Sequence, residues 1–294
     1  MVSRIGLGTV ALGLDYGIPT PGSRLRPEPR DAARLLQSAL DMGVSLIDTA
    51  PSYGESEELI GTAIGHRRHE FVLATKVTPS AREPDRIRKS VHASLRALRT
   101  DVLDLVQLHC SPTDKEPDVP TTEALLELKR CGQIRYLGAS VYGAAGDVAM
   151  ASGHFDCLQV AYSALDRRIE AELLPYAEQK GIGILARSVL LKGALTDRVH
   201  VLPDELEPLR KAVKELERLA GGEVECLPEL AYRFALSNSA IDSVLAGVTS
   251  IHELEQALVW AARGALSHEL LNAIRATSSL SEQLLTPAFW PALA

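Results

Sequence analysis

Short apolar runs alternate with longer amphipathic stretches along the whole chain of 294 residues. A short apolar run bounded by glycine, proline or polar residues is typical of a buried strand. On this basis we expect strands at residues 5–9, 46–48, 71–75, 102–108, 134–139, 157–160, 182–186 and 243–246.

The amphipathic stretches predict helices, because their apolar residues recur every three or four positions. In the stretch 31–42, Leu35, Leu36 and Ala39 share one face, and Gly43 ends the helix. Ser56 is expected to cap the next helix. Comparable patterns predict helices at about 56–65, 84–98, 121–131, 146–151, 169–180, 205–220, 228–236, 251–262 and 268–279. A Gly- and Pro-rich loop before residue 31 and a tail at 284–294 complete the prediction.

Eight predicted strands therefore alternate with helices, and no linker or low-complexity tract interrupts them. This order favours a parallel sheet with right-handed crossovers. Eight units in about 290 residues favour a closed (β/α)₈ barrel, one domain over residues 1–294, with extra helices after the seventh strand and at the C-terminus. Gly6 and Gly8 only faintly resemble a dinucleotide fingerprint, because the third glycine is misplaced and no helix follows at once.

Composition narrows the possible partners. The apolar fraction of 46% can build a large core, and the net charge of −7 is made of scattered charges. Nucleic acid and membrane are therefore unexpected partners. We expect the first residues to lead into a strand rather than to form a signal peptide. The four cysteines are too far apart to suggest zinc or a redox pair. We expect a cytoplasmic protein with a small-molecule substrate, as a monomer or small homo-oligomer.

Candidate chemistry gathers where the predicted strands end, which is the catalytic face of a barrel. The residues found there are Thr9, Asp48, Lys76, His109, Ser140, Gln159, Arg187 and Gly247. Tyr53 lies five residues after Asp48 in a loop. Each of these residues alone has an ordinary structural interpretation, but a carboxylate, a phenol, an amine and an imidazole on one rim indicate a site. His66 and His69 have a metal-like spacing, yet they lie in an Arg-rich turn and are interpreted as surface residues, so no metal site is predicted.

Three segments resemble signatures of the aldo-keto reductases, and the resemblance extends over the whole chain: LIDTAPSYGESE, ATKV and VQLHC. The segments LGTVALGLDYGI, LGASVY and ILARSVLLKGALT are most similar to a bacterial branch often associated with carbohydrate pathways. The resemblance implies a nicotinamide-dependent oxidoreductase whose catalytic residues are Asp48, Tyr53, Lys76 and His109.

The same resemblance implies where the coenzyme and substrate bind. Ser140 and Gln159 would meet the carboxamide, Arg187 would stack on the nicotinamide in place of an aromatic residue, and Val141 stands where many relatives have asparagine. The full set of implied coenzyme contacts is Gly8, Thr9, Val10, Asp48, Ser140, Gln159, Arg187, Ser188, Leu190, Gly193, Gly247, Val248, Thr249 and Glu253. Val10, Tyr53 and His109 would contact the substrate.

These residue types suit carbonyl reduction. The reaction needs a hydride at carbon and a proton at oxygen, and Tyr53 would give the proton. A lysine ammonium at Lys76 would favour the phenolate, Asp48 would anchor the ammonium, and His109 would orient the carbonyl oxygen.

Two other functions remain open at this point. Lys76 at a strand end would also suit a Schiff-base aldolase, and a non-catalytic nucleotide-sensing subunit would share the coenzyme site. Coenzyme choice is also open, because the family habit is NADP, whereas segment 247–253 contains no lysine or arginine. Glu253 in that segment suggests that NAD is tolerated.

Overall fold

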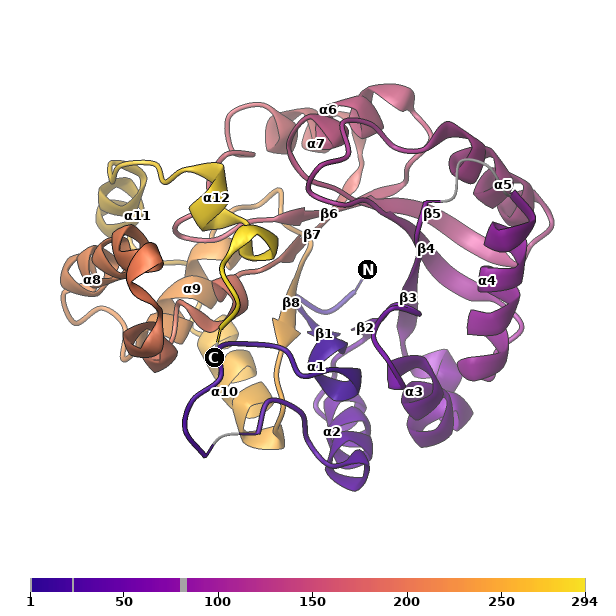
Figure 1. The fold of residues 1–294 in the computed structure, drawn as a ribbon, viewed down its shortest axis with the longest axis horizontal. Helices are drawn as coiled ribbons and strands as arrows, with labels where there is room; N and C mark the ends of the chain where they lie inside the picture. Colours follow the sequence, from indigo (N-terminus) through magenta and orange to yellow (C-terminus); the bar gives the residue numbers. More distant parts are fainter. Residues whose placement is uncertain (1, 23, 80–83, 294) are drawn as a thin grey trace.

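The computed structural model describes residues 2–22, 24–79 and 84–293. Within these residues eight parallel strands close into a barrel in chain order, and β8 pairs with β1. The strands are β1 (Ile5–Gly8), β2 (Leu46–Asp48), β3 (Val72–Val77), β4 (Leu103–His109), β5 (Ile134–Ser140), β6 (Cys157–Ala161), β7 (Gly183–Arg187) and β8 (Ser243–Gly247). The predicted (β/α)₈ barrel is confirmed (Figure 1).

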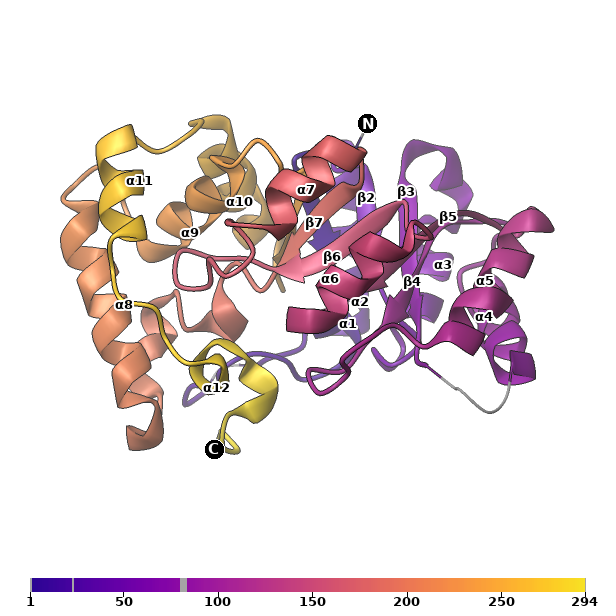
Figure 2. The same ribbon diagram turned by 90° about the horizontal axis from the view of Figure 1, so that it is seen from above.

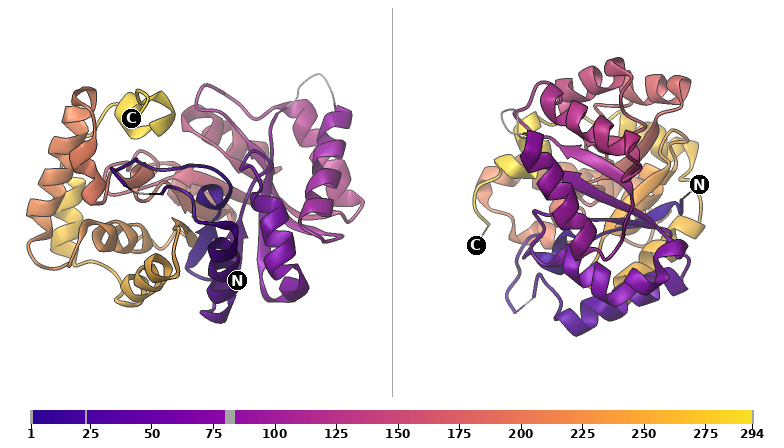
Figure 3. Two further views of the ribbon diagram at one scale, coloured as in Figure 1. Left: turned by 60° about the horizontal axis from the view of Figure 1, so that its bottom comes forward. Right: turned by 90° about the vertical axis from the view of Figure 1, so that its right-hand side faces the viewer.

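Helices form the outer layer around the strands (Figure 1, Figure 3). The α-helices are α1 (Val10–Gly13), α2 (Pro29–Asp41), α3 (Ser56–Ile64), α4 (Pro84–Ala97), α5 (Val119–Arg130), α6 (Gly143–Ser152), α7 (Leu173–Lys180), α8 (Glu207–Ala220), α9 (Leu227–Leu236), α10 (Ile251–Ala262), α11 (His268–Arg275) and α12 (Glu282–Leu285). Short 3₁₀ helices are η1 (Gly65–Glu70), η2 (Leu191–Gly193), η3 (Asp197–Val201), η4 (Asp204–Leu206) and η5 (Pro287–Phe289). The extra helices expected after β7 and at the C-terminus are present, and α8 packs beside α9 and α11. The two ends of the described chain lie on opposite sides of the barrel (Figure 2).

Four local predictions are wrong in detail. The loop before residue 31 contains α1, and the predicted tail at 284–294 contains the end of α12 and η5. The helix expected at 169–180 begins only at Leu173, because Glu170 is held by the Tyr162 hydroxyl and by Arg275 from α11. Ser56 does not cap α3, which has Glu55 at its N-cap. Instead its hydroxyl is buried and bonds to Thr9 Oγ1 at 2.7 Å.

The barrel interior consists of two layers that follow from strand alternation. Leu46, Ala74, Leu105, Leu185 and Leu245 form a separate apolar cluster inside the barrel. Side chains two residues apart on a strand face the same side. The next inward positions are therefore polar on four of these strands: Asp48, Lys76, Gln107 and Arg187. An apolar plug thus supports a polar layer at the end of the barrel where the strands terminate.

Carboxylates at the opposite end of the barrel tie neighbouring strands together. Asp104, Asp156 and Asp242 each accept a hydrogen bond from a backbone N–H of the adjacent strand, at distances of 2.8, 2.8 and 2.7 Å. Asp104 is buried and also pairs with Arg68 and Arg135. This end of the molecule therefore stabilises the barrel and lies away from the polar layer.

We predict that Asp104→Asn lowers the free energy of unfolding by about 1–3 kcal/mol, because a buried charged acceptor loses its two cationic partners. Urea unfolding measures the change. Asp101→Asn is the matched control, because Asp101 is exposed and surface changes usually stay within about 0.5 kcal/mol. Equal effects of the two substitutions would contradict this role for Asp104.

Candidate active site

Asp48 is the centre of the polar layer. Its Oδ2 accepts from the Lys76 ammonium at 2.6 Å. Its Oδ1 accepts from the side-chain amides of Gln107 and Gln159, at 2.9 and 2.8 Å. Lys76 also donates to the carbonyl oxygen of Thr49 at 3.0 Å. Residues from β2, β3, β4 and β6 therefore meet around one buried carboxylate.

Lys76 is charged although it is fully buried. Burial by itself would lower the pKa of the ammonium, but Asp48 and Tyr53 outweigh that effect and raise the pKa above its usual value. The Lys76 nitrogen lies 5.0 Å from the centroid of the Tyr53 ring. The structure thus holds a permanent cation directly beside the tyrosine.

The backbone around Tyr53 is fixed by a close approach between two loops. A Cβ atom on Gly13 would lie 1.8 Å from the Tyr53 carbonyl oxygen, and one on Gly54 would lie 2.4 Å from the Gly13 carbonyl oxygen. Gly54 also has a φ of +57°, which favours glycine. Glycine at positions 13 and 54 therefore allows the backbone of α1 to pack directly against the Tyr53 loop.

His109 ends β4 beside Tyr53. The two rings meet edge to face, with centroids 6.2 Å apart and an interplanar angle of 87°. Burial and the nearby Lys76 cation lower the pKa of His109 to about 4, and Arg187 adds to this effect. The imidazole is therefore neutral near pH 7, so one ring nitrogen carries a proton and can donate a hydrogen bond.

Most of the predicted coenzyme-binding residues line one cavity of about 600 Å³. A cavity of this size is in the usual range for a small-molecule site. The predicted residues found in its wall are Gly8, Thr9, Val10, Asp48, Tyr53, Gln159, Arg187, Ser188, Leu190, Gly193, Gly247, Val248, Thr249 and Glu253. Lys76, His109 and Ser140 are not in the wall. Lys76 lies behind Asp48, and Ser140 donates to Gln159 Oε1 at 3.3 Å.

Sequence reasoning missed several wall residues, among them Tyr16, Gln256 and Trp260. Gln256 follows Glu253 by three residues on α10, so helical spacing could have identified it. Tyr16 gave no such signal. Burial of the Tyr16 phenol raises its pKa to about 12, and the Arg187 cation opposes this shift. The residue as a whole is 40% exposed.

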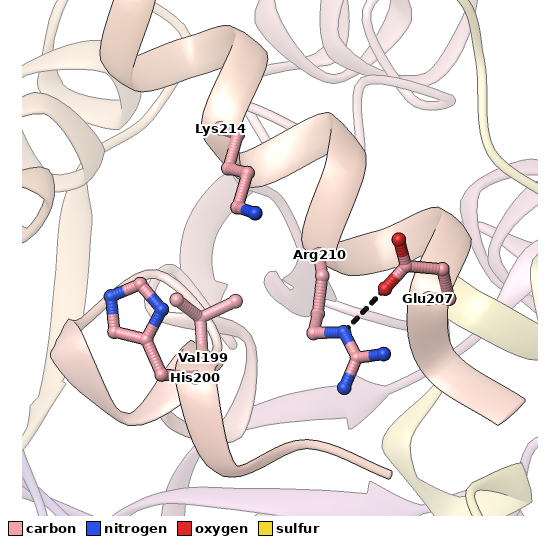
Figure 4. Close-up of a pocket in the computed structure, with 5 residues that line it drawn as sticks. All are labelled: Val199, His200, Glu207, Arg210 and Lys214. Atoms are coloured by element: carbon pink, nitrogen blue, oxygen red, sulfur yellow. Dashed lines mark hydrogen bonds and ion pairs between the residues drawn. The ribbon is translucent and has the colours of Figure 1, made fainter. Parts of the chain in front are cut away.

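A second hollow, of about 280 Å³, lies between η3 and α8. Figure 4 shows His200, Arg210, Glu207 and Lys214 around it. Arg210 donates to Glu207 at 2.5 Å and to Asp204 at 2.9 Å, so its charge is balanced within the protein. The arrangement indicates a surface ion-pair network.

Within the part of the chain that the structure describes, no group of three or more histidine, cysteine or acidic side chains could hold a metal ion. His66 and His69 are exposed on η1. Among the same residues, no helix is long and apolar enough to cross a membrane.

Comparison with known proteins gives consistent matches. A sequence model of the aldo/keto reductase family matches residues 4–278. Aldo-keto reductase YhdN of Bacillus subtilis (strain 168) is 33% identical over 86% of this chain and 83% of that protein. The NADH-specific methylglyoxal reductase of Escherichia coli (strain K12) is 30% identical over 87% of this chain and 88% of that protein. The holo form of aldo-keto reductase AKR11C1 from Bacillus halodurans matches with a TM-score of 0.78 and 26% identity, covering 97% of this chain and 96% of that chain.

We predict that the ring protons of His109 titrate in nuclear magnetic resonance spectra with a midpoint near pH 4. The unfolded imidazole binds its proton near pH 6.5. The stability due to neutral His109 is therefore fully present above about pH 6.5 and is lost as the pH falls toward 4.

In the His109→Gln variant the ring-proton resonances of His109 should be missing, which identifies them in the wild-type spectrum. The variant should also lose less stability than the wild type as the pH falls from about 6.5 to 4. A His109 midpoint near 6.5 in the folded protein would contradict the prediction.

Proposed function

Since the chain belongs to the aldo/keto reductase family, we propose that it reduces a small polar aldehyde or ketone with Tyr53 as the proton donor. The family is one of NAD(P)-dependent oxidoreductases, and this chain is such an enzyme. The observation that supports the proposed residue roles is the position of Tyr53 between the charged Lys76 and the neutral His109, beside a large open cavity.

Each side chain has a distinct task in this proposal. The nicotinamide coenzyme supplies the hydride. Tyr53 gives a proton to the carbonyl oxygen, and the ammonium of Lys76 stabilises the phenolate that remains. Asp48 holds that ammonium in place through a 2.6 Å hydrogen bond. His109 is neutral, so its N–H can point at the carbonyl oxygen and orient it without donating a net charge.

We propose that the nicotinamide dinucleotide lies along the wall of this cavity. Gln159 would meet the carboxamide, supported from behind by Ser140. Ser188, Leu190 and Gly193 would follow the pyrophosphate along the loop after β7, and the segment 247–253 would meet the adenosine end. Ser188 has a φ of +59°, an unusual conformation for serine that is typical of ligand-binding loops.

We propose a substrate that is small and sugar-derived. The relative from Escherichia coli named as a methylglyoxal reductase supports a small polar carbonyl compound. The reacting end of the cavity is polar, with Tyr16, Asp48, Tyr53 and Arg187 in its wall.

The alternative aldolase function is disfavoured by the state of Lys76. A Schiff base requires a neutral amine, whereas Asp48 and Tyr53 favour the ammonium and its nitrogen already donates two hydrogen bonds. A non-catalytic sensing subunit would bind the coenzyme without turning over any aldehyde. Consumption of NADPH or NADH with a simple aldehyde separates that function from the proposed one.

We also propose that the chain forms one domain and works in the cytoplasm. Its four cysteines support a reducing compartment, because none forms a disulfide: Cys110, Cys131, Cys157 and Cys226.

We further propose that the enzyme discriminates weakly between NADP and NAD. Glu253 lines the cavity at its adenosine end, and its Oε2 accepts from the Thr249 backbone N–H at 2.7 Å and from the Thr249 hydroxyl at 3.1 Å. A carboxylate fixed there would repel a 2′-phosphate and could accept a hydrogen bond from a 2′-hydroxyl. The Escherichia coli relative is an NADH-specific methylglyoxal reductase, which supports tolerance of NAD by this chain.

We predict that Tyr53→Phe lowers kcat about 10²–10⁴-fold, because it removes the proton donor. The dissociation constant of the coenzyme should stay nearly unchanged, since the ring remains. Absorbance assays of turnover and fluorescence titrations of binding measure the two quantities. Tyr136→Phe, at an exposed position on β5, is the control. A Tyr53→Phe enzyme with normal kcat would exclude Tyr53 from the mechanism.

We predict that Glu253→Arg lowers the dissociation constant of NADPH about tenfold or more, because one charge-assisted bond to phosphate replaces a repulsion. The effect on NADH should be smaller. Glu255→Arg is the matched control, since it makes the same charge change at an exposed position on α10. If the wild type binds NADPH about a thousandfold tighter than NADH, the interpretation of Glu253 is wrong.

A further inference from the structure

Arg187 is held rigidly at the end of β7. Its guanidinium lies 4.0 Å from the centroid of the Tyr142 ring. One terminal nitrogen, Nη2, donates to the carbonyl oxygen of Val141 at 3.0 Å, and Nη1 donates to the Ser188 hydroxyl at 3.4 Å. A planar guanidinium stacked on a ring and bonded at both ends has little freedom to move.

The charge of Arg187 is not balanced by a carboxylate. Among the residues that the structure describes, Arg187 takes part in no ion pair. Asp48, a buried acid that lines the same cavity, already pairs with Lys76. Arg187 nevertheless lines the same cavity as Asp48, Tyr53 and Gln159. At Arg187 the cavity wall therefore carries a fixed positive charge that no carboxylate among the described residues compensates.

The field of this cation reaches the reacting groups. It contributes to the lowered pKa of His109, after burial and Lys76, and it acts on the phenol of Tyr16 as well. β6 and β7 are paired, with Ala161 opposite Arg187, so the guanidinium lies on the strand next to the one that provides Gln159. A group bound against Gln159 and facing Tyr53 is consequently exposed to the Arg187 charge.

The two forms of the coenzyme differ in charge at their reacting ring. When the neutral reduced ring gives up a hydride, which is a proton with two electrons, the ring becomes a cation. The carbonyl carbon accepts the hydride and the oxygen takes the proton of Tyr53, so the atoms and electrons balance. The phosphates and the adenosine end keep their charges in both forms.

We propose that Arg187 discriminates between the two oxidation states of the coenzyme, weakening the binding of the oxidised form relative to the reduced form. This inference rests on the proposed function. The repulsion acts only on the cationic ring, so it speeds release of the oxidised product and limits inhibition by it. The same repulsion makes hydride transfer to the substrate less favourable within the bound complex. Arg187 therefore improves coenzyme exchange rather than the chemical step.

The test is the ratio of two dissociation constants, that of the oxidised form divided by that of the reduced form. Quenching of protein fluorescence can report both forms, since Trp260 lines the cavity. Wild-type protein should bind the reduced form about tenfold or more tightly. Arg187→Met should lower the ratio about tenfold, and Arg187→Lys, which keeps the charge, should retain most of it. NAD(H) and NADP(H) should give the same ratio, because the 2′-group does not change on oxidation.

Lys192→Met is the matched control, because Lys192 lines the same cavity on the loop after β7. Removing its charge should weaken both forms equally and leave the ratio unchanged. An unchanged ratio in Arg187→Met would overturn the inference. Equal binding of both coenzyme forms by the wild type would overturn it as well, and that measurement does not depend on the folding of any variant. Failure of the wild type to bind any coenzyme would instead overturn the proposed function.

Discussion

The buried pair of Asp48 and Lys76 is the constraint on which the rest of the site depends. Removing two opposite charges from water is costly, and their attraction offsets this cost only when the remaining hydrogen-bonding groups are also satisfied. Here Gln107, Gln159 and the carbonyl oxygen of Thr49 complete the set. The pair fixes a cation beside Tyr53. For this reason the barrel interior contains charged side chains at a level where apolar side chains could also pack.

The residues that stabilise the barrel and the residues of the candidate site lie at opposite ends of the barrel axis. At the end where the strands begin, Asp104, Asp156 and Asp242 tie neighbouring strands through backbone N–H groups. An apolar cluster fills the interior next to them, and the polar layer follows two residues later along the strands. Substitutions in the cavity wall can therefore change binding with little effect on the contacts that close the barrel.

Charges along the cavity differ in how they are compensated. Lys76 is paired and His109 is neutral. Within the described residues, Arg187 forms no ion pair, and the carboxylate of Glu253 accepts hydrogen bonds from Thr249. Under the proposed function these two charges act on different parts of the coenzyme: Arg187 on the oxidation state of the ring, and Glu253 on the 2′-group.

The sequence by itself determined the order of strands and helices, the closed barrel and the convergence of Asp48, Tyr53, Lys76 and His109, because hydrophobic periodicity is local and strand ends share one face. Only the tertiary structure showed that Gln107 joins Asp48, Lys76 and Arg187 in the polar layer. Gln107 lies inside β4, and its contact with Asp48 exists only through the register of neighbouring strands. The bonding of Ser56 to Thr9, the late start of α7 and the neutrality of His109 likewise depend on residues distant in sequence. Burial and long-range partners, which no local pattern encodes, set these features.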